Sequence, residues 1–580
     1  MPEQKKMCYV MGIHVFDNPH NLYIMKSDID IAKSATLKPV VDIAKQVGIE
    51  ADDLELYGKY KAKLPLKLID HEKLKNSNLI LVSAISPTPA GEGKTTMSIG
   101  LSQGLNHIGA DSTVVLREPS LGPVFGIKGG ATGGGMSQVL PMEDINLHFT
   151  GDFAAIEKAH NLLAAMIDNN LQAKRNNLGL DPRTVLWKRV MDMNDRSLRK
   201  MVIGLGGRTS GTPRESGFDI TAASEVMAIL CLANDLEDLK EKLGNIFVGY
   251  TFDRKPVFAR DLKAHGAMAA LLKDAIKPNL VQTLENTPAI IHGGPFANIA
   301  QGTNSVIATR MGMSMSDYVV TEAGFGFDLG AEKFFDIKCG YSGLSPKAVV
   351  LVATARALKY HGGADLDKVN EPNMDALKKG IENLEKHIEN IKTFDICAVV
   401  AINKFATDTQ EELDFIKKRS EELGIDAVIA DVWGAGGEGA EDLAKRVKFV
   451  ADNCENAYKP MYDWKWDVPK KVETLAKKIY GAAAIDFTSK AKADLKKIEN
   501  LGLSELPICV AKTQKSLSDN PELLGRPKDF VVTVREIQIA SGAGFVIPIT
   551  GSIMRMPGLP AEPSAVKIDI DSEGNISGLF

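Results

Sequence analysis

The stretch SPTPAGEGKT (86–95) follows the apolar run NLILVSAI (78–85) and precedes the segment 94–108. A continuous apolar run is typical of a strand that is buried on both faces of a parallel sheet. In segment 94–108 the apolar spacing fits a helix better than strict alternation. The run TVVL (113–116) predicts the next strand. We therefore expect a strand–loop–helix–strand unit whose right-handed crossover lays the helix across the sheet.

The loop of this unit is a candidate phosphate-binding loop. The usual pattern is Gly, four residues and Gly-Lys-Ser/Thr. Here Gly93-Lys94-Thr95 is intact, but Thr88 stands in place of the first glycine. Lys94 would reach the terminal phosphates of a nucleotide, and the Thr95 hydroxyl would ligate Mg²⁺. The predicted nucleotide-binding residues are Thr88, Pro89, Ala90, Gly91, Glu92, Gly93, Lys94, Thr95 and Thr96. The alternative is a Pro-Gly turn that caps an ordinary helix.

A second cation follows the next predicted strand. Arg117 ends that strand, in TVVLREPSLGP. Ligands of open α/β sheets bind outside the C-terminal ends of the strands. If the two strands lie close together, Arg117 faces the same crevice as Lys94 and can hold a phosphoryl or acyl-phosphate group. The alternative is a solvated arginine at a strand end.

Further along the chain, short apolar runs alternate with helical stretches. The runs are NIFVGYT (245–251), PAIIHGG (288–294), DYVVTEAGFG (317–326), DICAVVAIN (395–403) and IDAVIADVWG (425–434), and the helical stretches include 375–392 and 409–424. This alternation predicts an α/β fold: a phosphate-loop NTPase-like parallel-sheet domain, a second α/β domain and a smaller C-terminal domain. We place these domains at 1–335, 336–455 and 456–580, because prolines and aromatics change the composition after Cys454.

Composition narrows the class of protein. Hydrophobic residues make up 44% and charged residues 25%, as in a packed soluble protein. The net charge of −5 argues against a nucleic-acid partner. We expect no membrane span and no secretory signal, and hence a cytoplasmic protein. The six cysteines form no CxxC pair, so neither a zinc site nor a redox pair is expected.

From Met25 onward the chain resembles the formate–tetrahydrofolate ligases, whose phosphate loop also reads Thr-Pro-Ala-Gly-Glu-Gly-Lys-Thr. The other matching stretches are LREPSLGPVFGIKGGATGGG, PMEDINLHFTGD, WKRVMDMNDRSLR, GFDITAASEVMAIL, VATARALKYHGG and MPGLP. The chain departs from the family at Ala131-Thr132 and Met136 in the glycine-rich signature, at Ala355, where a β-branched residue is usual, and at Arg555, where threonine is common.

The resemblance implies an ATP-dependent ligase. Formate would attack the γ-phosphate of ATP to give formyl phosphate, and N10 of tetrahydrofolate would then take the formyl group. It implies ATP and Mg²⁺ as cofactors, activation by K⁺ or NH₄⁺, and a homotetramer. Lys94 and Arg117 would neutralise charge during phosphoryl transfer, with Glu118 as a third catalytic residue.

The folate would bind to the second α/β segment. Phe405 in INKFATDT and Trp433 in DVWGAGGEG each follow a predicted strand. A flat pterin fits between two such rings at stacking distance, and both positions match the pterin-stacking residues of the family. The alternative is two aromatics packed beneath their own loops.

Other polar residues in the matching stretches have no single assignment. Glu118, Asp144 and Asp152 are candidates to bind the monovalent cation or to orient the attacking amine, or they cap loops. His148 is either a proton acceptor or a structural histidine. No Walker-B aspartate stands out, so the rest of the Mg²⁺ shell stays open.

Two rival functions remain. One is a phosphate-loop ligase that activates a different carboxylate, and the other is a nucleotide switch that controls a protein partner. A switch has no need of two aromatics beside the crevice, so Phe405 and Trp433 favour an enzyme.

Overall fold

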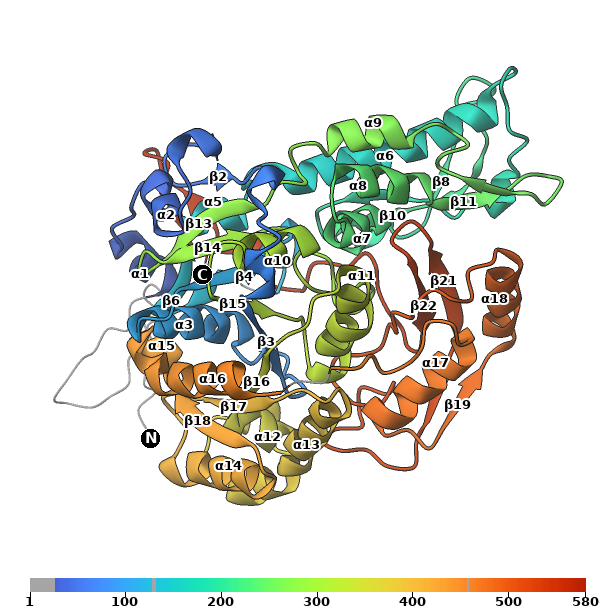
Figure 1. Ribbon diagram of the computed structural model, residues 1–580. Helices are drawn as coiled ribbons and strands as arrows, with labels where there is room; N and C mark the ends of the chain where they lie inside the picture. The colour runs from blue at the N-terminus through green and yellow to red at the C-terminus, as the bar shows by residue number, and fades with distance from the viewer. Residues whose placement is uncertain (1–26, 128–131, 456–457, 580) are drawn as a thin grey trace, which may run out of the picture.

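The computed structural model describes residues 27–127, 132–455 and 458–579 (Figure 1). Met25, where the family-like sequence is expected to start, lies outside these ranges. Within them, every helix is too short or too polar to cross a membrane.

One twelve-stranded sheet organises the molecule, in the order β1-β2-β13-β14-β4-β15-β3-β16-β17-β18, with β6 beside β13 and β5 beside β6. The run from β14 to β18 is parallel throughout. Its strands are β14 (Pro288–Ile291), β4 (Ser112–Leu116), β15 (Tyr318–Glu322), β3 (Asn78–Ala84), β16 (Ala348–Ala353), β17 (Ala398–Asn403) and β18 (Asp426–Ala430). The others are β1 (Glu55–Leu56), β2 (Ala62–Lys63), β5 (Gly133–Gly134), β6 (Ser137–Leu140) and β13 (Asn279–Thr283).

The expectation of a parallel sheet is wrong at the other edge, where β13 runs antiparallel to β14, β2 and β6. A tight turn closed by the Thr283 N–H bond to the Thr287 carbonyl oxygen (2.9 Å) joins β13 to β14. So short a connection permits only antiparallel pairing. The run 245–251 was also misplaced: β11 (Phe247–Tyr250) pairs with β12 (Pro256–Phe258) in a separate antiparallel sheet.

Both faces of the parallel run are covered, as its apolar strands predict. In β3, Leu79 and Leu81 face one hydrophobic core, whereas Ile80 and Val82 face another. The first core includes side chains of α10 (Val306–Met313), α12 (Ala355–His361), α13 (Met374–Thr393) and α14 (Gln410–Glu422). The second includes α3 (Lys94–His107) and α16 (Glu441–Asn453). The helix and the two strands of the predicted unit are therefore confirmed.

The strands of segment 336–455 belong to this same sheet. β16 pairs directly with β3, and β17 and β18 follow. Segments 1–335 and 336–455 thus share hydrogen-bonded strands, and the division into three domains stays a prediction.

Two smaller bodies lie next to each other on one side of the sheet (Figure 1). One holds α6 (Asp152–Gln172), α7 (Glu225–Leu232), α8 (Leu236–Gly244), α9 (His265–Leu271), β7 (Arg189–Met191), β8 (Met201–Ile203), β9 (Arg214–Ser216), β10 (Phe218–Ile220), β11 and β12. The other, near the C-terminus, holds α17 (Val468–Leu475), α18 (Ser489–Asn500), β19 (Ala484–Phe487), β20 (Val531–Val534), β21 (Glu536–Ala540) and β22 (Phe545–Ile549). The remaining elements are α1 (Asp28–Ser34), α2 (Val40–Gln46), α4 (Leu121–Phe125), α5 (Met142–Asn146), α11 (Gly340–Ser342), α15 (Val432–Ala435), β23 (Asp569–Ile570) and β24 (Ile576–Ser577).

Two of the cysteines are paired, which the sequence did not indicate. Cys397 and Cys454 form a disulfide, with their Cα atoms 6.4 Å apart. They are separated by 57 residues, so no local motif marks the pair. Cys397 immediately precedes β17 and Cys454 immediately follows α16, and α16 packs against β17.

Candidate active site

The predicted phosphate loop connects the C-terminal end of β3 to the first turn of α3. Gly91 and Gly93 have positive φ angles of 82° and 71°, which favour glycine. A Cβ atom on Gly93 would lie 2.6 Å from Asn403 Nδ2. Thr88 does not have a positive φ, so this position does not need the glycine of the usual pattern.

A buried carboxylate holds the loop in shape. Glu92 is only 1% exposed and accepts the Thr88 N–H at 2.6 Å and the Thr354 hydroxyl. Its backbone oxygen accepts Asn403 Nδ2 at 3.1 Å, and its carboxylate lies 3.7 Å from Arg356 Nε. Two predicted nucleotide-binding residues, Thr88 and Glu92, are therefore bonded to each other inside the loop.

A pair of neutral histidines supports the base of the loop. His361 Nδ1 accepts the Gly525 N–H at 3.1 Å, so Nε2 carries the proton and donates to the Ser86 carbonyl oxygen at 2.9 Å. The Ser86 hydroxyl lies 3.1 Å from His387 Nε2 and accepts a bond from Asn383 Nδ2. Burial lowers the pKa of His361 and of His387 to about 4.

Thr95 and Arg117 meet at one carboxylate that the sequence did not indicate. β15 lies between β3 and β4 and ends at Glu322. Thr95 Oγ1 donates to Glu322 Oε2 at 2.9 Å, and Arg117 Nη2 lies 3.7 Å from Glu322 Oε1. The buried Arg117 Nε has no hydrogen-bond partner among the described residues. The structure thus brings Arg117 to the phosphate-loop helix even though its strand is not the nearest neighbour.

Glu118 belongs to a different cluster. It is 5% exposed, and burial, with the nearby Asp152 and Asp192 carboxylates, raises its pKa well above the usual range. Asp152 pairs with Lys63 Nζ at 2.7 Å and accepts Asn279 Nδ2 at 2.8 Å. Glu118 therefore lies beside a buried ion pair, away from the Glu322 carboxylate.

Two further candidates lie at the surface. Asp144 forms an ion pair with Lys61 at 2.6 Å and its side chain is 47% exposed. His148 is exposed, and its two alternative roles stay predictions.

The two predicted pterin-binding aromatics follow β17 and β18, at the same edge of the sheet as the phosphate loop. The Arg356 guanidinium lies over the Phe405 ring, 3.9 Å from its centroid. It also donates to the Gly91 carbonyl oxygen, so it connects Phe405 to the phosphate loop. The indole of Trp433 bonds to the Asp28 carboxylate and packs on Gly135, where a Cβ would lie 2.7 Å from Trp433 Cγ.

This arrangement can bind and transfer a phosphoryl group. A helix N-terminus attracts phosphate, Lys94 is the first residue of this helix, and Arg117 adds a charge near one carboxylate and one threonine hydroxyl. A family comparison decides which reaction this is: the model described as Formate--tetrahydrofolate ligase matches residues 26–580. The chain belongs to this family. It is an ATP-dependent ligase that formylates tetrahydrofolate.

Sequence reasoning missed two polar residues of this ligase. Glu322 ends the run DYVVTE, and the polar end of a predicted strand was the available signal. Arg356 lies in the matching stretch VATARALKYHGG, but its contact with Phe405 depends on the pairing of β16 with β17.

Proposed function

We propose that this ligase works through formyl phosphate. A formate oxygen attacks the γ-phosphorus of ATP, the bond from this phosphorus to the bridging oxygen breaks, and ADP leaves. N10 of tetrahydrofolate then attacks the formyl carbon, the carbon–oxygen bond to phosphate breaks, and N10 gives up its proton. Phosphorylation is needed because formate would otherwise have to expel oxide.

The partnerless Arg117 Nε carries this proposal. A buried guanidinium N–H without an acceptor costs free energy unless a ligand supplies one. Arg117 follows β4, which is separated from β3 and the phosphate loop by β15. An oxygen of the transferred group at this edge would accept the hydrogen bond of Arg117 Nε. In the same scheme Lys94 holds the terminal phosphates, and Lys94 and Arg117 together stabilise the negative charge on the phosphoryl group during its transfer.

Thr95 and Glu322 are the residues that would hold Mg²⁺. Their side-chain oxygens already lie 2.9 Å apart, and Mg²⁺ prefers oxygen ligands from one or two side chains together with substrate phosphates. The ion would neutralise phosphate charge. Glu322 also pairs with Arg117, so it fixes the arginine beside the metal position.

Glu118 acts in our proposal as a positioning group, because its carboxyl faces the Lys63–Asp152 pair. The Lys63 ammonium already supplies a cation to Asp152, which argues against K⁺ or NH₄⁺ on that carboxylate. We therefore propose that the monovalent cation binds to residues other than Asp152.

For the folate we propose a pterin site between Phe405 and Trp433. Arg356 covers one face of Phe405, so the pterin would stack on the other face. We further propose a phosphate-loop NTPase-like nucleotide domain and a homotetramer, the latter supported by the family resemblance. A cytoplasmic location is proposed from the sequence, in which we expect no membrane span and no secretory signal.

The test follows the oxygen of formate. With ¹⁸O-formate, ATP and tetrahydrofolate, one labelled oxygen should appear in the released phosphate, because it becomes the bridging oxygen of formyl phosphate. ADP release should be sustained only when formate and tetrahydrofolate are both present. Unlabelled phosphate would exclude the intermediate, equal turnover with acetate would favour the rival ligase, and ADP release without either substrate would favour a switch.

A further inference from the structure

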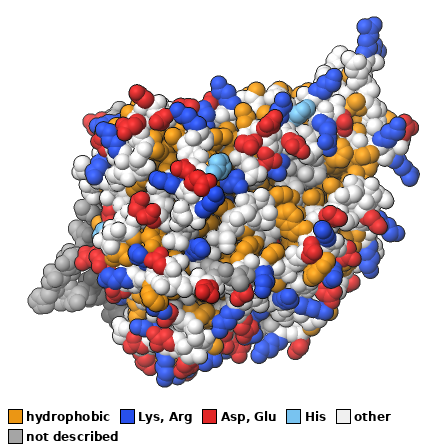
Figure 2. Space-filling model, viewed as in Figure 1, with side chains coloured by type: hydrophobic (Ala, Val, Ile, Leu, Met, Phe, Trp, Pro, Cys, Tyr) orange, Lys and Arg blue, Asp and Glu red, His pale blue; other side chains and the backbone are white. Residues whose placement is uncertain are grey.

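A cavity of about 330 Å³ lies away from the phosphate loop, between the two smaller bodies. One wall comes from α7, from β10 and from the residues before β7, and the other from α18, β21 and β22. Figure 2 shows apolar side chains gathered along this junction. Apolar lining is supplied by Trp187, Phe247, Ile299, Ile539, Phe545 and Ile547. A volume near the low end of ligand pockets suits a small molecule.

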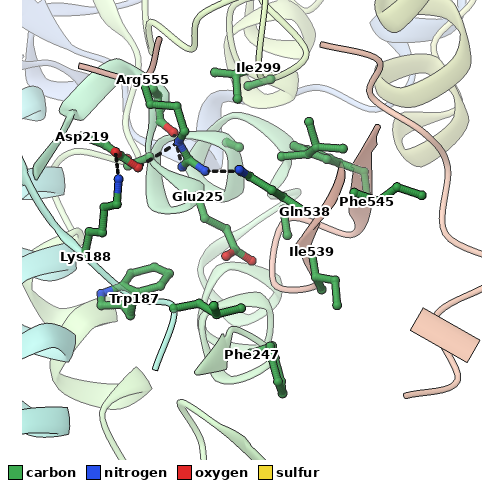
Figure 3. A pocket seen from close by; sticks show the side chains of 18 of the residues that line it. Trp187, Lys188, Asp219, Glu225, Phe247, Ile299, Gln538, Ile539, Phe545 and Arg555 are labelled. Carbon is green, nitrogen blue, oxygen red and sulfur yellow. Dashed lines mark hydrogen bonds and ion pairs between the residues drawn. The ribbon is translucent and has the colours of Figure 1, made fainter. Parts of the chain in front are cut away.

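Most charges in this lining are already paired. Asp219 lies 3.1 Å from Lys188 Nζ and 2.8 Å from Arg555 Nε. Arg555 also donates to Gln538 Oε1 at 2.6 Å and to the Ala223 carbonyl oxygen at 3.0 Å (Figure 3). On the opposite wall Lys490 pairs with Glu536. These groups build the rim and leave little charge to a ligand.

Two groups of opposite sign make no ion pair within 4 Å among the described residues: Glu225 and Lys497. Glu225 Oε1 accepts the Gly542 and Ala543 N–H groups at 2.7 and 3.3 Å, while its carboxylate stands at the centre of Figure 3. Burial raises the pKa of Glu225 to about 7, a cost that an ammonium group would remove. The Lys497 ammonium lies over the Phe247 ring, 4.9 Å from its centroid.

Asp494 is the other lining carboxylate without an ion pair at this distance. It precedes Lys497 by one turn of α18 and accepts the Ile537 N–H at 3.0 Å. That bond ties α18 to β21, so Asp494 has a structural role. Glu225, held by backbone N–H groups, and Lys497, over the Phe247 ring, are thus a carboxylate and an ammonium on opposite walls of the cavity that no ion pair neutralises.

We propose that this cavity binds an α-amino acid with an apolar side chain. Its ammonium group bonds to Glu225, its carboxylate to Lys497, and its side chain packs among Phe247, Trp187 and the isoleucines. Both charges of a zwitterion are then matched, and no net charge is buried. This site is separate from the proposed ligase chemistry, since no lining residue belongs to the phosphate loop or to the aromatic pair.

The test is calorimetric titration of the full-length enzyme with L-phenylalanine and L-leucine. Two related probes each lack one charge: 2-phenylethylamine has no carboxylate and 3-phenylpropanoate has no ammonium. Both should bind at least tenfold more weakly than L-phenylalanine, because each leaves one charged group of the cavity unmatched.

Two variants locate the site. Glu225→Gln keeps an oxygen for the Gly542 N–H but removes the charge, and Lys497→Met keeps an apolar stem on Phe247. Each should weaken L-phenylalanine binding at least tenfold, whereas Lys492→Met, on the exposed side of α18, should not. Ligase turnover without amino acid should stay unchanged in all three. No heat with either amino acid, equal binding of 3-phenylpropanoate, or unchanged affinity in both cavity variants would overturn the proposal.

Discussion

The phosphate loop and the two aromatic loops lie at the same edge of one sheet, but the protein holds them differently. The phosphate loop is fixed from within: Glu92 is buried and bonded, and two histidines support Ser86 from below. Phe405, shortly after β17, and Trp433, in the short helix α15, are half-buried side chains. Phosphoryl transfer needs cations in fixed positions, whereas binding a flat pterin needs only two rings at the right spacing. We therefore expect substitutions in the first region to cost far more than substitutions in the second.

The largest effect should come from Lys94→Ala. Removing a cation from the phosphate end of the loop should lower turnover by on the order of 10³-fold or more. Steady-state ADP release measures the loss, and a thermal melt close to that of the parent shows that the fold is intact. Turnover near the parent value in a folded variant would remove the phosphate loop from the mechanism.

Arg117→Ser should separate chemistry from nucleotide binding. In our proposal Arg117, which pairs with Glu322, binds the transferred group, so turnover should fall by about 10²-fold while the Kd for ATP stays within a few-fold. Equilibrium ATP titration beside the rate assay gives both values. Parallel losses of affinity and rate would assign Arg117 to the nucleotide site instead.

Arg356→Met tests the one side chain that connects the two regions. The change leaves Glu92 buried without its cation and uncovers Phe405, so ATP affinity should fall by roughly 10²-fold and folate affinity by less. Lys404→Met, at a half-exposed lysine beside Asp431, is the matched control. If only folate affinity responds, Arg356 serves the aromatic side alone.

Low pH should lower the free energy of unfolding, because His361 and His387, which support the start of the phosphate loop, become protonated. Their folded pKa values of about 4 lie below the ordinary 6.5, so their contribution is full above pH 6.5 and is lost as the pH falls toward 4. At pH 5 the loss amounts to roughly 2 kcal/mol for each histidine. Urea unfolding at pH 7 and pH 5 should show a smaller loss in His361→Gln, which retains a donor and an acceptor but does not titrate. The exposed His71→Gln should behave like the parent, and identical pH dependence in all three would remove His361 from this role.

Features that depend on residues close in sequence could be predicted, whereas features that depend on contacts between distant segments could not. The strand, loop and helix around Gly93 are set by neighbours in sequence, and their predicted positions agree with β3, α3 and β4. Glu322 was missed because its role depends on β15 entering between β3 and β4, which no local pattern specifies. The Cys397–Cys454 disulfide and the packing of Arg356 on Phe405 were missed for the same reason, because each joins residues that only the tertiary fold brings together. Residues lining the cavity between the two smaller bodies come from segments as distant as Lys188 and Arg555, so only the folded chain brings them together.

The smallest effect should come from the aromatic pair. Truncating Phe405 or Trp433 to Ala removes roughly 0.5–1.5 kcal/mol of stacking together with some apolar burial. The Michaelis constant for tetrahydrofolate should therefore rise by about an order of magnitude, since ~1.4 kcal/mol is tenfold in affinity. The Kd for ATP should stay unchanged in Trp433→Ala, because the contacts of Trp433 are with Gly135 and Asp28, neither of which belongs to the phosphate loop.

Trp433 also gives an optical readout of the same interaction. A pterin stacked on its indole should quench tryptophan fluorescence, and Trp433→Phe should abolish the quenching while retaining an aromatic ring and most of the folate affinity. The other tryptophans, Trp187, Trp464 and Trp466, supply the background signal in that control. Phe405→Ala should instead reduce the extent of quenching at a given folate concentration. Unchanged folate kinetics in both alanine variants, with no Trp433-dependent quenching, would place the pterin elsewhere on this edge of the sheet.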